Sequence, residues 1–233
     1  MTVAVADCRI TDRLSVSLSA YADTLIKLPP FSRFSPPVAS HPDMLIFEHS
    51  GYIYTWEEYF YEAKSTFDKL SCLDFKIKFI KESASANYPY DVRLNAARVG
   101  KRLIANKKHV SSSLAELGFE LLHTNQGYAK CSTVTVSENA IITADESIFR
   151  AASLATIDAL KVRSGHVRLD GYDTGFIGGA TAVSEKHVLF CGSIHSHPDA
   201  DSIIAFCRKH NKSVVSLTND SLYDYGTVML LKK

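Results

Sequence analysis

The chain has 233 residues, of which 46% are hydrophobic, and its 26 basic and 25 acidic side chains give a formal net charge of +1. This near-neutral charge argues against a nucleic-acid or membrane partner. The length and apolar content suffice for a sizeable buried core, and no linker divides the chain, so we expect a single domain over residues 1–233.

The cysteines and the N-terminal residues indicate a reducing, cytoplasmic location. The five cysteines are odd in number and include no Cys-x-x-Cys pair, which is typical of free thiols rather than of disulfides or a structural zinc site. Asp7 and Arg9 interrupt any signal-peptide pattern, and no apolar run reaches the roughly 18 residues of a membrane span. We therefore expect a cytoplasmic protein, and the sequence does not indicate an oligomeric state.

The first expected elements are a strand over residues 2–6, a helix over Asp12–Ala20 and a strand over Thr24–Leu28, which Pro29 and Pro30 end. Two hairpins follow, centred near Asp43 and Asn95. After them come helix and strand pairs, over Thr55–Leu70 and Phe75–Ile80, and over Ser111–Gly118 and Phe119–His123.

The middle of the chain shows the clearest unit. Residues 131–136 alternate in hydrophobicity as a strand does, residues 137–139 form a polar turn, and residues 140–143 supply the returning strand. A helical pattern then runs over residues 148–155, and a third apolar run surrounds Leu160. One unit is therefore strand, turn, strand, helix, strand.

The same unit recurs around Gly178, where a second turn resembles the one at residues 137–139 and a helix begins near Pro198. The last run, Tyr225–Lys233, supplies a first strand only, whereas residues 2–6 supply a second strand that lacks its first. We therefore expect the two terminal strands to pair.

The units repeat with a nearly constant period. Their first strands start near Asp43, Asn95, Ser132, Gly179 and Gly226, in steps of 52, 37, 47 and 47 residues. A period of this length indicates a repeat architecture. We predict an α/β fold, a five-fold pseudosymmetric α/β propeller of strand-strand-helix-strand modules that is closed by pairing of the N- and C-terminal strands.

Three Tyr-Asp dipeptides precede first strands, and their carboxylates belong to Asp91, Asp173 and Asp224. Equivalent positions in a ring of repeats face the axis together. We therefore expect these carboxylates to lie close together, with Asn95 and Gly179, at one end of the central opening of the ring. We regard them as candidate substrate-binding residues.

No cofactor or metal site is expected. Gly175, Gly178 and Gly179 lack the strand and spacing of a dinucleotide fingerprint, and close packing at the centre of the ring explains them better. Gly178 and Gly179 are therefore counted among the candidate substrate-binding residues. His195 and His197 are two residues apart in a predicted loop and have no partners with metal-ligand spacing.

Cys131 allows two interpretations. At the start of a first strand its thiol would point into the central opening and act as a nucleophile. Alternatively it is a buried small hydrophobic residue, as most free cysteines are.

His41 and Asp43 also allow two interpretations. On an extended segment both side chains project to one side, where an imidazole beside a carboxylate forms a general acid/base pair. Alternatively Pro42 and Asp43 simply close a turn. The second Ser-His-Pro-Asp sequence, which contains His197, fits a helix start.

Five such modules, the His41-x-Asp43 step and the Gly127-x-x-x-Cys131 strand together resemble the guanidino-group-modifying enzymes of the pentein α/β-propeller fold, such as arginine deiminase and dimethylarginine dimethylaminohydrolase. The segments HPDML, GYAKCS, YDTGFIGGA and LYDYG more narrowly resemble an uncharacterised bacterial family placed in that fold.

In those enzymes a cysteine thiolate attacks the guanidinium carbon, a histidine shuttles protons and carboxylates hold the guanidinium. The resemblance implies that Cys131 is the nucleophile and His41 the acid/base. It implies Asp43, Asp173 and Asp224 as candidate substrate clamps, since a planar cation needs paired acceptors.

Two features of this sequence differ from those of the guanidino-group-modifying enzymes. The order of the units requires a circular permutation, and Ala129-Lys130 precedes Cys131 where the enzymes have a glycine run and a histidine. The resemblance implies a cysteine-dependent hydrolase or transferase, deiminase-like or amidinotransferase-like, acting without a cofactor on a guanidine or amidine small molecule. The alternative is a non-catalytic propeller that binds a protein or ribosomal partner.

Overall fold

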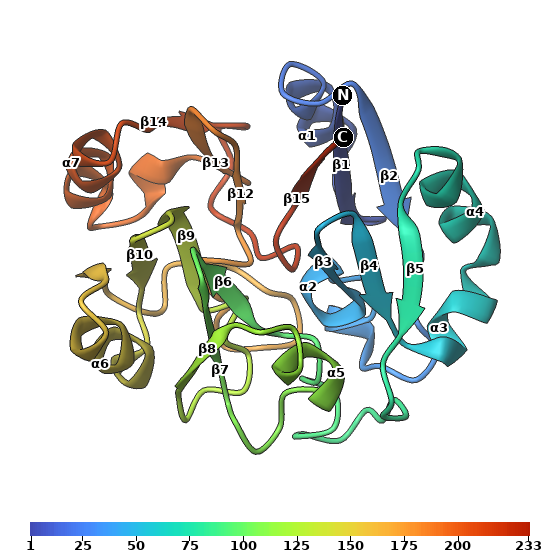
Figure 1. The fold of residues 1–233 in the computed structure, drawn as a ribbon. Coiled ribbons are helices and arrows are strands. Elements are labelled where there is room, and N and C mark those ends of the chain that lie inside the picture. Colours follow the sequence, from blue (N-terminus) through green and yellow to red (C-terminus); the bar gives the residue numbers. More distant parts are fainter.

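Five three-stranded sheets surround a central axis in the computed structural model, which describes residues 1–233 (Figure 1). Their strand orders are β15-β1-β2, β3-β4-β5, β6-β7-β8, β9-β10-β11 and β12-β13-β14. In each sheet the first strand is antiparallel to the second, and the second is parallel to the third. The strands are β1 (Thr2–Asp7), β2 (Thr24–Leu28), β3 (Ile46–His49), β4 (Tyr52–Thr55), β5 (Lys76–Phe79), β6 (Ala97–Val99), β7 (Arg102–Ala105), β8 (Glu120–His123), β9 (Thr133–Ser137), β10 (Ala140–Thr143), β11 (Asp158–Lys161), β12 (Thr181–Val183), β13 (His187–Phe190), β14 (Ser213–Ser216) and β15 (Met229–Lys232).

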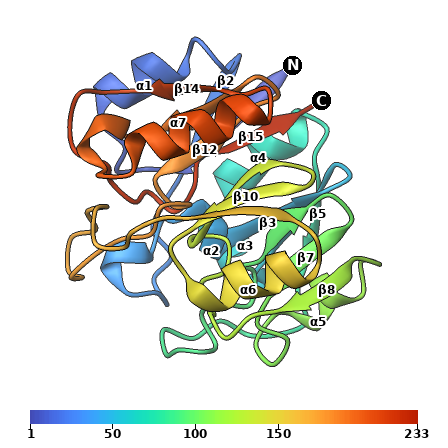
Figure 2. The ribbon, with the colours of Figure 1, turned by 90° about the vertical axis from the view of Figure 1, so that its left-hand side faces the viewer.

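Most helices lie on the outside of this ring, as the two views in Figures 1 and 2 show. Each connects the second strand of a sheet to the third, and we call a sheet with its helices a blade. None of the helices is long and apolar enough to cross a lipid bilayer. The helices are α1 (Asp12–Leu18), α2 (Pro42–Leu45), α3 (Glu57–Glu62), α4 (Lys64–Cys72), α5 (Ser112–Ala115), α6 (Glu146–Leu154) and α7 (Ala200–Lys209), with 3₁₀ turns η1 (Pro36–Val38) and η2 (Ile194–Ser196).

Pairing of the chain ends closes the ring, as the sequence predicts. Strand β15 runs antiparallel to β1, with Val3 opposite Leu231 and Val5 opposite Met229. The terminal amino group of Met1 donates a hydrogen bond of 2.9 Å to the carbonyl of Lys233. Figure 1 shows the two ends side by side. The predicted five-fold propeller is confirmed.

The middle strands are apolar on both faces. All four residues of β10 are buried, and in β1 the five residues after Thr2 are buried. Each middle strand lies between two other strands, with a helix on one face and the adjacent blade on the other. Because both faces are covered, its sequence is a continuous apolar run. The middle strand is therefore the most buried strand of each blade.

The segment around Asp43 differs from the prediction. Asp43 lies in the short helix α2, and β3 begins only at Ile46, so the expected extended segment is wrong here. Pro42 occupies the first helical position, where its fixed backbone angle favours a helical turn. The backbone N–H of Asp43 donates to the carbonyl of Gly226 at 3.0 Å, which holds this turn against the last blade.

Other boundaries also differ from the prediction, among them the following. Cys131 lies in a turn just before β9, which begins at Thr133 rather than at the cysteine. The helix expected over Thr55–Leu70 divides at Ala63 into α3 and α4. Helix α7 begins at Ala200, two residues after Pro198. At these places, which lie at the ends of blades, the structure has a short turn with polar groups where the sequence predicted the end of a strand or helix.

Trp56 links the hydrophobic core to α2. The indole is fully buried, and its Nε1–H donates a hydrogen bond of 2.9 Å to the carbonyl of Met44. The neighbouring Thr55 hydroxyl donates to the carbonyl of Leu45 at 2.8 Å. These two bonds satisfy carbonyls at the end of α2 and fix the helix that carries Asp43.

We expect Trp56→Ala to lower the free energy of unfolding by about 3–5 kcal/mol, because it leaves a large cavity and an unpaired carbonyl. Urea denaturation followed by circular dichroism measures this, since Trp56 is the one tryptophan and fluorescence is lost with it. The control is Leu154→Ala, at a side chain that is 86% exposed, with an expected change within about 0.5 kcal/mol. Equal stability of the two variants would contradict this role of Trp56.

Candidate active site

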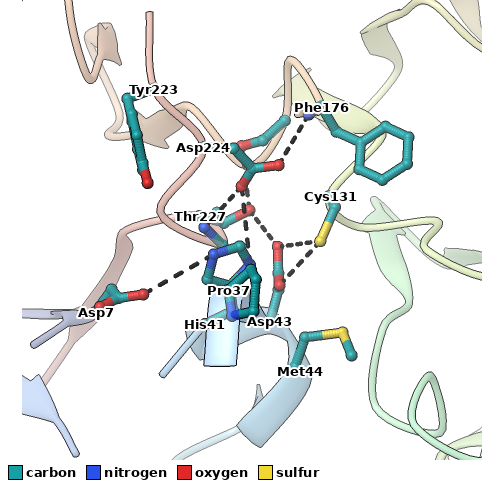
Figure 3. Close-up of polar contacts among 12 residues, drawn as sticks. Asp7, Pro37, His41, Asp43, Met44, Cys131, Phe176, Tyr223, Asp224 and Thr227 are labelled. Atoms are coloured by element: carbon teal, nitrogen blue, oxygen red, sulfur yellow. Dashed lines mark hydrogen bonds and ion pairs between the residues drawn. The ribbon is translucent and has the colours of Figure 1, made fainter. Parts of the chain in front are cut away.

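A thiol and a carboxylate meet at the hub of the ring. The Sγ atom of Cys131 lies 3.0 Å from each of the two carboxylate oxygens of Asp43, and 3.1 Å from Nδ2 of Asn95 (Figure 3). All three side chains are buried. They come from three different blades, so the ring closure brings together groups that are far apart in the sequence.

Asp43 accepts hydrogen bonds from several directions. The Thr227 hydroxyl donates to its Oδ2 at 2.8 Å, and the Asn95 amide donates to its Oδ1 at 3.2 Å. Burial raises the pKa of Asp43, while its hydrogen bonds and the positive charge of Lys130 oppose that rise. Burial and the charge of Asp43 hold the pKa of the Cys131 thiol well above its usual range. The thiol is therefore protonated in this arrangement.

Asn95 fixes the turn that carries Cys131. Its Oδ1 accepts hydrogen bonds from the backbone N–H groups of Lys130, at 2.7 Å, and of Cys131, at 3.2 Å. Its Nδ2 donates to Asp43. Asn95 thus binds the turn through its amide oxygen and the Asp43 carboxylate through its amide nitrogen. These bonds set the distance between the thiol and the carboxylate.

His41 lies beside this pair. Its Nε2 is 3.9 Å from an oxygen of Asp7 and its Nδ1 is 3.9 Å from an oxygen of Asp224, and neither ring nitrogen makes a hydrogen bond. Burial, together with the charge of Arg9, lowers the pKa of His41 to about 3. Figure 3 shows the imidazole between the two carboxylates. His41 is therefore a neutral, unpartnered imidazole at the hub.

Asp224 also reaches the hub. It accepts hydrogen bonds from the backbone N–H groups of Phe176, at 2.8 Å, and of Gly226, at 2.9 Å. Burial and then the charge of Asp43 raise the pKa of Asp224 to about 7, although the two amide donors oppose this rise. Gly226 has φ +66° and packs directly on His41, so a side chain at this position would displace the imidazole.

The predicted glycines pack against the hub. A Cβ atom on Gly179 would overlap the carboxylate of Asp224, and one on Gly178 would overlap backbone carbonyls of the turn at Cys131. The backbone N–H of Gly179 donates to the carbonyl of Cys131 at 2.8 Å. Both residues therefore let two chain segments approach closely at the centre.

Two of the predicted carboxylates lie elsewhere. Asp173 is exposed and lines a surface hollow with Arg168 and Asp170. Asp91 is buried, but its carboxylate accepts a hydrogen bond of 2.7 Å from the hydroxyl of Tyr128. Of the three Tyr-Asp carboxylates, the structure brings only that of Asp224 to Cys131, because the loops before the first strands differ in length and path.

Several hub residues were missed by the sequence reasoning. Asp7 is buried and forms a bidentate pair with Arg9, with Nη2 to Oδ2 at 2.5 Å and Nε to Oδ1 at 3.0 Å. Thr227 was missed as well, and its hydroxyl donates to Asp43. Lys130 was already noted in the sequence as the residue directly before Cys131. Thr227 directly follows Gly226, near which the last of the first strands was predicted to start. Including one further residue at the start of each unit would therefore have identified Thr227 as a candidate. Asp7 carried no such signal, since it ends a second strand rather than starting a first.

A cavity of about 260 Å³ runs along the axis and reaches the Asp43 carboxylate, whereas Cys131 is not among the residues that line it. Asp43, Lys130 and Thr227 line one end, and Glu48 and Arg98 line it as well. The other walls are largely apolar and come from the first strands. The remaining lining residues are Ile46, Phe47, Leu94, Ala96, Thr135, Val183, Val228, Met229, Leu230 and Leu231.

One group of side chains at the hub has donor atoms of the kinds that transition metals bind. A ring nitrogen of His41, an oxygen of Asp43 and Sγ of Cys131 lie within 4.8 Å of one another. A soft thiolate with an imidazole and a carboxylate suits zinc. The same three groups also suit covalent catalysis by a thiol with an adjacent base.

The fold is that of the pentein α/β-propellers, to which guanidino-group-modifying enzymes belong. DDAH from Pseudomonas aeruginosa, in complex with citrulline, has a TM-score of 0.58 at 10% identity, over 94% of this chain and 91% of that chain. Agmatine deiminase from C. jejuni has a TM-score of 0.58 at 6% identity, over 93% and 87%. The amidinotransferase SxtG of the saxitoxin biosynthetic pathway, from Microseira wollei, has a TM-score of 0.56 at 11% identity, over 92% and 78%.

The sequence places the chain in a particular family within this fold. A family model described as "Family of unknown function (DUF6873)" matches residues 5–229, and the chain belongs to that family. No curated protein matches the chain by sequence.

We expect Asp224 to make stability fall as the pH rises. Because its folded pKa is raised to about 7 from 3.8, the folded chain binds more protons than the unfolded chain between these values. Asp43 has a shift in the same direction. In the wild type the unfolding free energy should fall as the pH rises over this range. Asp224→Asn should make this slope less steep, by up to about 1.4 kcal/mol per pH unit.

Urea denaturation from about pH 4 to about pH 7 measures this slope. The matched control is Asp173→Asn, which alters an exposed carboxylate and should leave the wild-type pH profile unchanged. A profile for Asp224→Asn that runs parallel to that of the wild type would show that Asp224 does not titrate in this range.

Proposed function

We propose that this protein is a cysteine-dependent hydrolase or transferase that acts on the planar carbon of a guanidine- or amidine-type small molecule, with Cys131 as nucleophile. The observation that carries the proposal is the contact of the Cys131 thiol with both oxygens of the buried Asp43 carboxylate. A thiol held against a base, with an imidazole within 4.8 Å, is an arrangement that supports nucleophilic catalysis.

Asp43 is the group best placed to activate the thiol. It accepts the thiol proton, and the sulfur forms a bond to the substrate carbon while the C=N electron pair moves to nitrogen. Collapse of this adduct breaks a C–N bond, and ammonia or an amine leaves with the proton from Asp43. The product of this half-reaction is an amidino group bonded to sulfur.

His41 serves the second half-reaction. Its two unpartnered ring nitrogens make it available to accept a proton from an attacking water, which then displaces the sulfur and leaves a ureido product. The proton returns to Cys131. With an amine in place of water, the same steps give transfer of the amidino group. The site therefore supports either a hydrolase or a transferase.

Similarity to known enzymes supports the substrate class. The structural neighbours include a DDAH in complex with citrulline, an agmatine deiminase and an amidinotransferase. Their fold is that of this chain, although identity is only 6–11%. A guanidine or amidine is therefore the first class of small molecule to test.

A second candidate function is a non-catalytic propeller that binds a protein or ribosomal partner. The observation that favours it is the burial of the hub, since Cys131 is 3% exposed and His41 and Asp43 are 1% exposed. The high thiol pKa agrees with a structural cysteine. The two functions differ in whether Cys131 reacts in the folded protein.

We expect Cys131→Ser to reduce turnover of a guanidine or amidine substrate by about a thousandfold or more, because the variant lacks the thiol nucleophile. Ammonia release, measured over a panel of guanidines and amidines, identifies the substrate first. Asp43→Asn should also abolish turnover, since an amide cannot accept the thiol proton.

The control is Cys72→Ser, at an exposed thiol, which should keep wild-type turnover. Circular dichroism and urea denaturation check that each variant is folded. Turnover retained in Cys131→Ser would exclude the thiol as nucleophile. No turnover in any variant, with capture of a protein or ribosomal partner by the folded wild type, would favour the second function.

A further inference from the structure

Lys130 brings a positive charge into the hub. Its side chain is half-buried and lines the axial cavity beside Asp43 and Thr227. The one hydrogen bond of its ammonium group is a long one, 3.5 Å from Nζ to the Thr227 hydroxyl, and it forms no salt bridge. An ammonium group has three donors, so two of them are available to a bound molecule.

The carboxylates of the hub already have hydrogen-bond partners. Asp7 is held by Arg9 through both of its oxygens. Asp43 accepts from the Asn95 amide at one oxygen and from the Thr227 hydroxyl at the other. Asp224 accepts two backbone N–H groups, one at each oxygen. Every carboxylate oxygen at the hub is therefore already bonded within the chain.

A guanidinium ion would be poorly accommodated in this field. Such a planar cation needs paired carboxylate acceptors. Of the predicted clamps, Asp173 lies at the surface, and the oxygens of Asp43 and Asp224 already accept hydrogen bonds from the chain itself. The guanidinium would also be desolvated next to the ammonium group of Lys130, where like charges repel. The cavity instead offers a cationic donor to an acceptor atom.

We propose that the site takes its planar C–N group uncharged, as an amide or a ureide, in preference to a guanidinium or amidinium cation, with Lys130 as the donor to the carbonyl oxygen. This inference rests on the proposed function, because it requires Cys131 to be the nucleophile. It keeps the cysteine-dependent hydrolase or transferase of the proposed function and replaces the guanidine or amidine substrate by a neutral isostere.

The reaction balances with the groups present. Asp43 takes the thiol proton, the sulfur attacks the carbonyl carbon, and the C=O electron pair moves to oxygen, where Lys130 stabilises the negative charge. The C–N bond breaks, the leaving nitrogen takes the proton from Asp43, and a thioester remains. Water then cleaves the thioester to an acid and restores the thiol, so that amide and water yield acid and ammonia or amine.

The cavity limits the size and polarity of the molecule. Its volume of about 260 Å³ equals about nine water-sized groups at roughly 30 Å³ each. Its walls beyond Lys130 are mainly apolar, with Leu94, Val183 and Met229 among them. The substituent on the amide or ureide is therefore small, with an apolar part that packs on these walls.

Two reagents of the same shape and different charge test this inference. 2-Chloroacetamide is neutral and 2-chloroacetamidine is a cation at pH 7.5, and both alkylate thiols. The rate of alkylation of Cys131 is measured for each by peptide mass spectrometry and divided by its rate with glutathione, which removes the intrinsic difference in reactivity. Exposed Cys72 serves as an internal control.

We expect the normalised rate at Cys131 to favour the neutral reagent by at least about tenfold, with no such preference at Cys72. Lys130→Met keeps the aliphatic side chain and removes the charge, so this preference should fall by about tenfold. The matched control is Lys108→Met, at an exposed lysine, which should retain the preference.

The other outcomes separate this inference from the proposed function. Faster labelling of Cys131 by the amidine reagent, whether or not Lys130 is present, would overturn the inference and leave the cysteine-dependent function standing. A preference for the neutral reagent that persists in Lys130→Met would overturn the role of Lys130. Failure of both reagents to label Cys131 in the folded protein, with labelling in urea, would overturn the inference and the proposed function together.

Discussion

The contact between the Cys131 thiol and the Asp43 carboxylate depends on the closure of the ring. These residues are 88 positions apart in the sequence, and the third partner of the carboxylate, Thr227, is 184 positions from Asp43. They meet because β1 pairs with β15 and the first strand of every blade starts at one axis.

Burial decides the protonation states at the hub. In water a thiol, two carboxylates and an imidazole would be partly charged, but desolvation penalises charge and drives the carboxyl and thiol pKa values up and that of His41 down. The ion pair of Arg9 with Asp7 keeps its two charges beside these groups. Burial therefore opposes charge on the thiol, the imidazole and the other two carboxyl groups of the hub.

The hub combines features of the pentein enzymes with a different polar arrangement. A cysteine, a histidine and carboxylates surround the axis, as in the resemblance that the sequence shows, but a lysine directly precedes the cysteine. In the structure this lysine lines the axial cavity beside Asp43. A shared fold therefore does not determine a shared function, which depends on the side chains at the hub.

The sequence by itself determined the repeating unit, the five-fold ring and the closure, because strand alternation and a constant period depend on local pattern. It also pointed to Cys131, His41 and Asp43, which stand close to the predicted starts of first strands. Only the tertiary structure showed that Asp43 lies in a helical turn and that Asp7 and Lys130 join the hub while Asp173 lies on the surface. Loop paths and the burial of charge depend on contacts between blades, which no local pattern records.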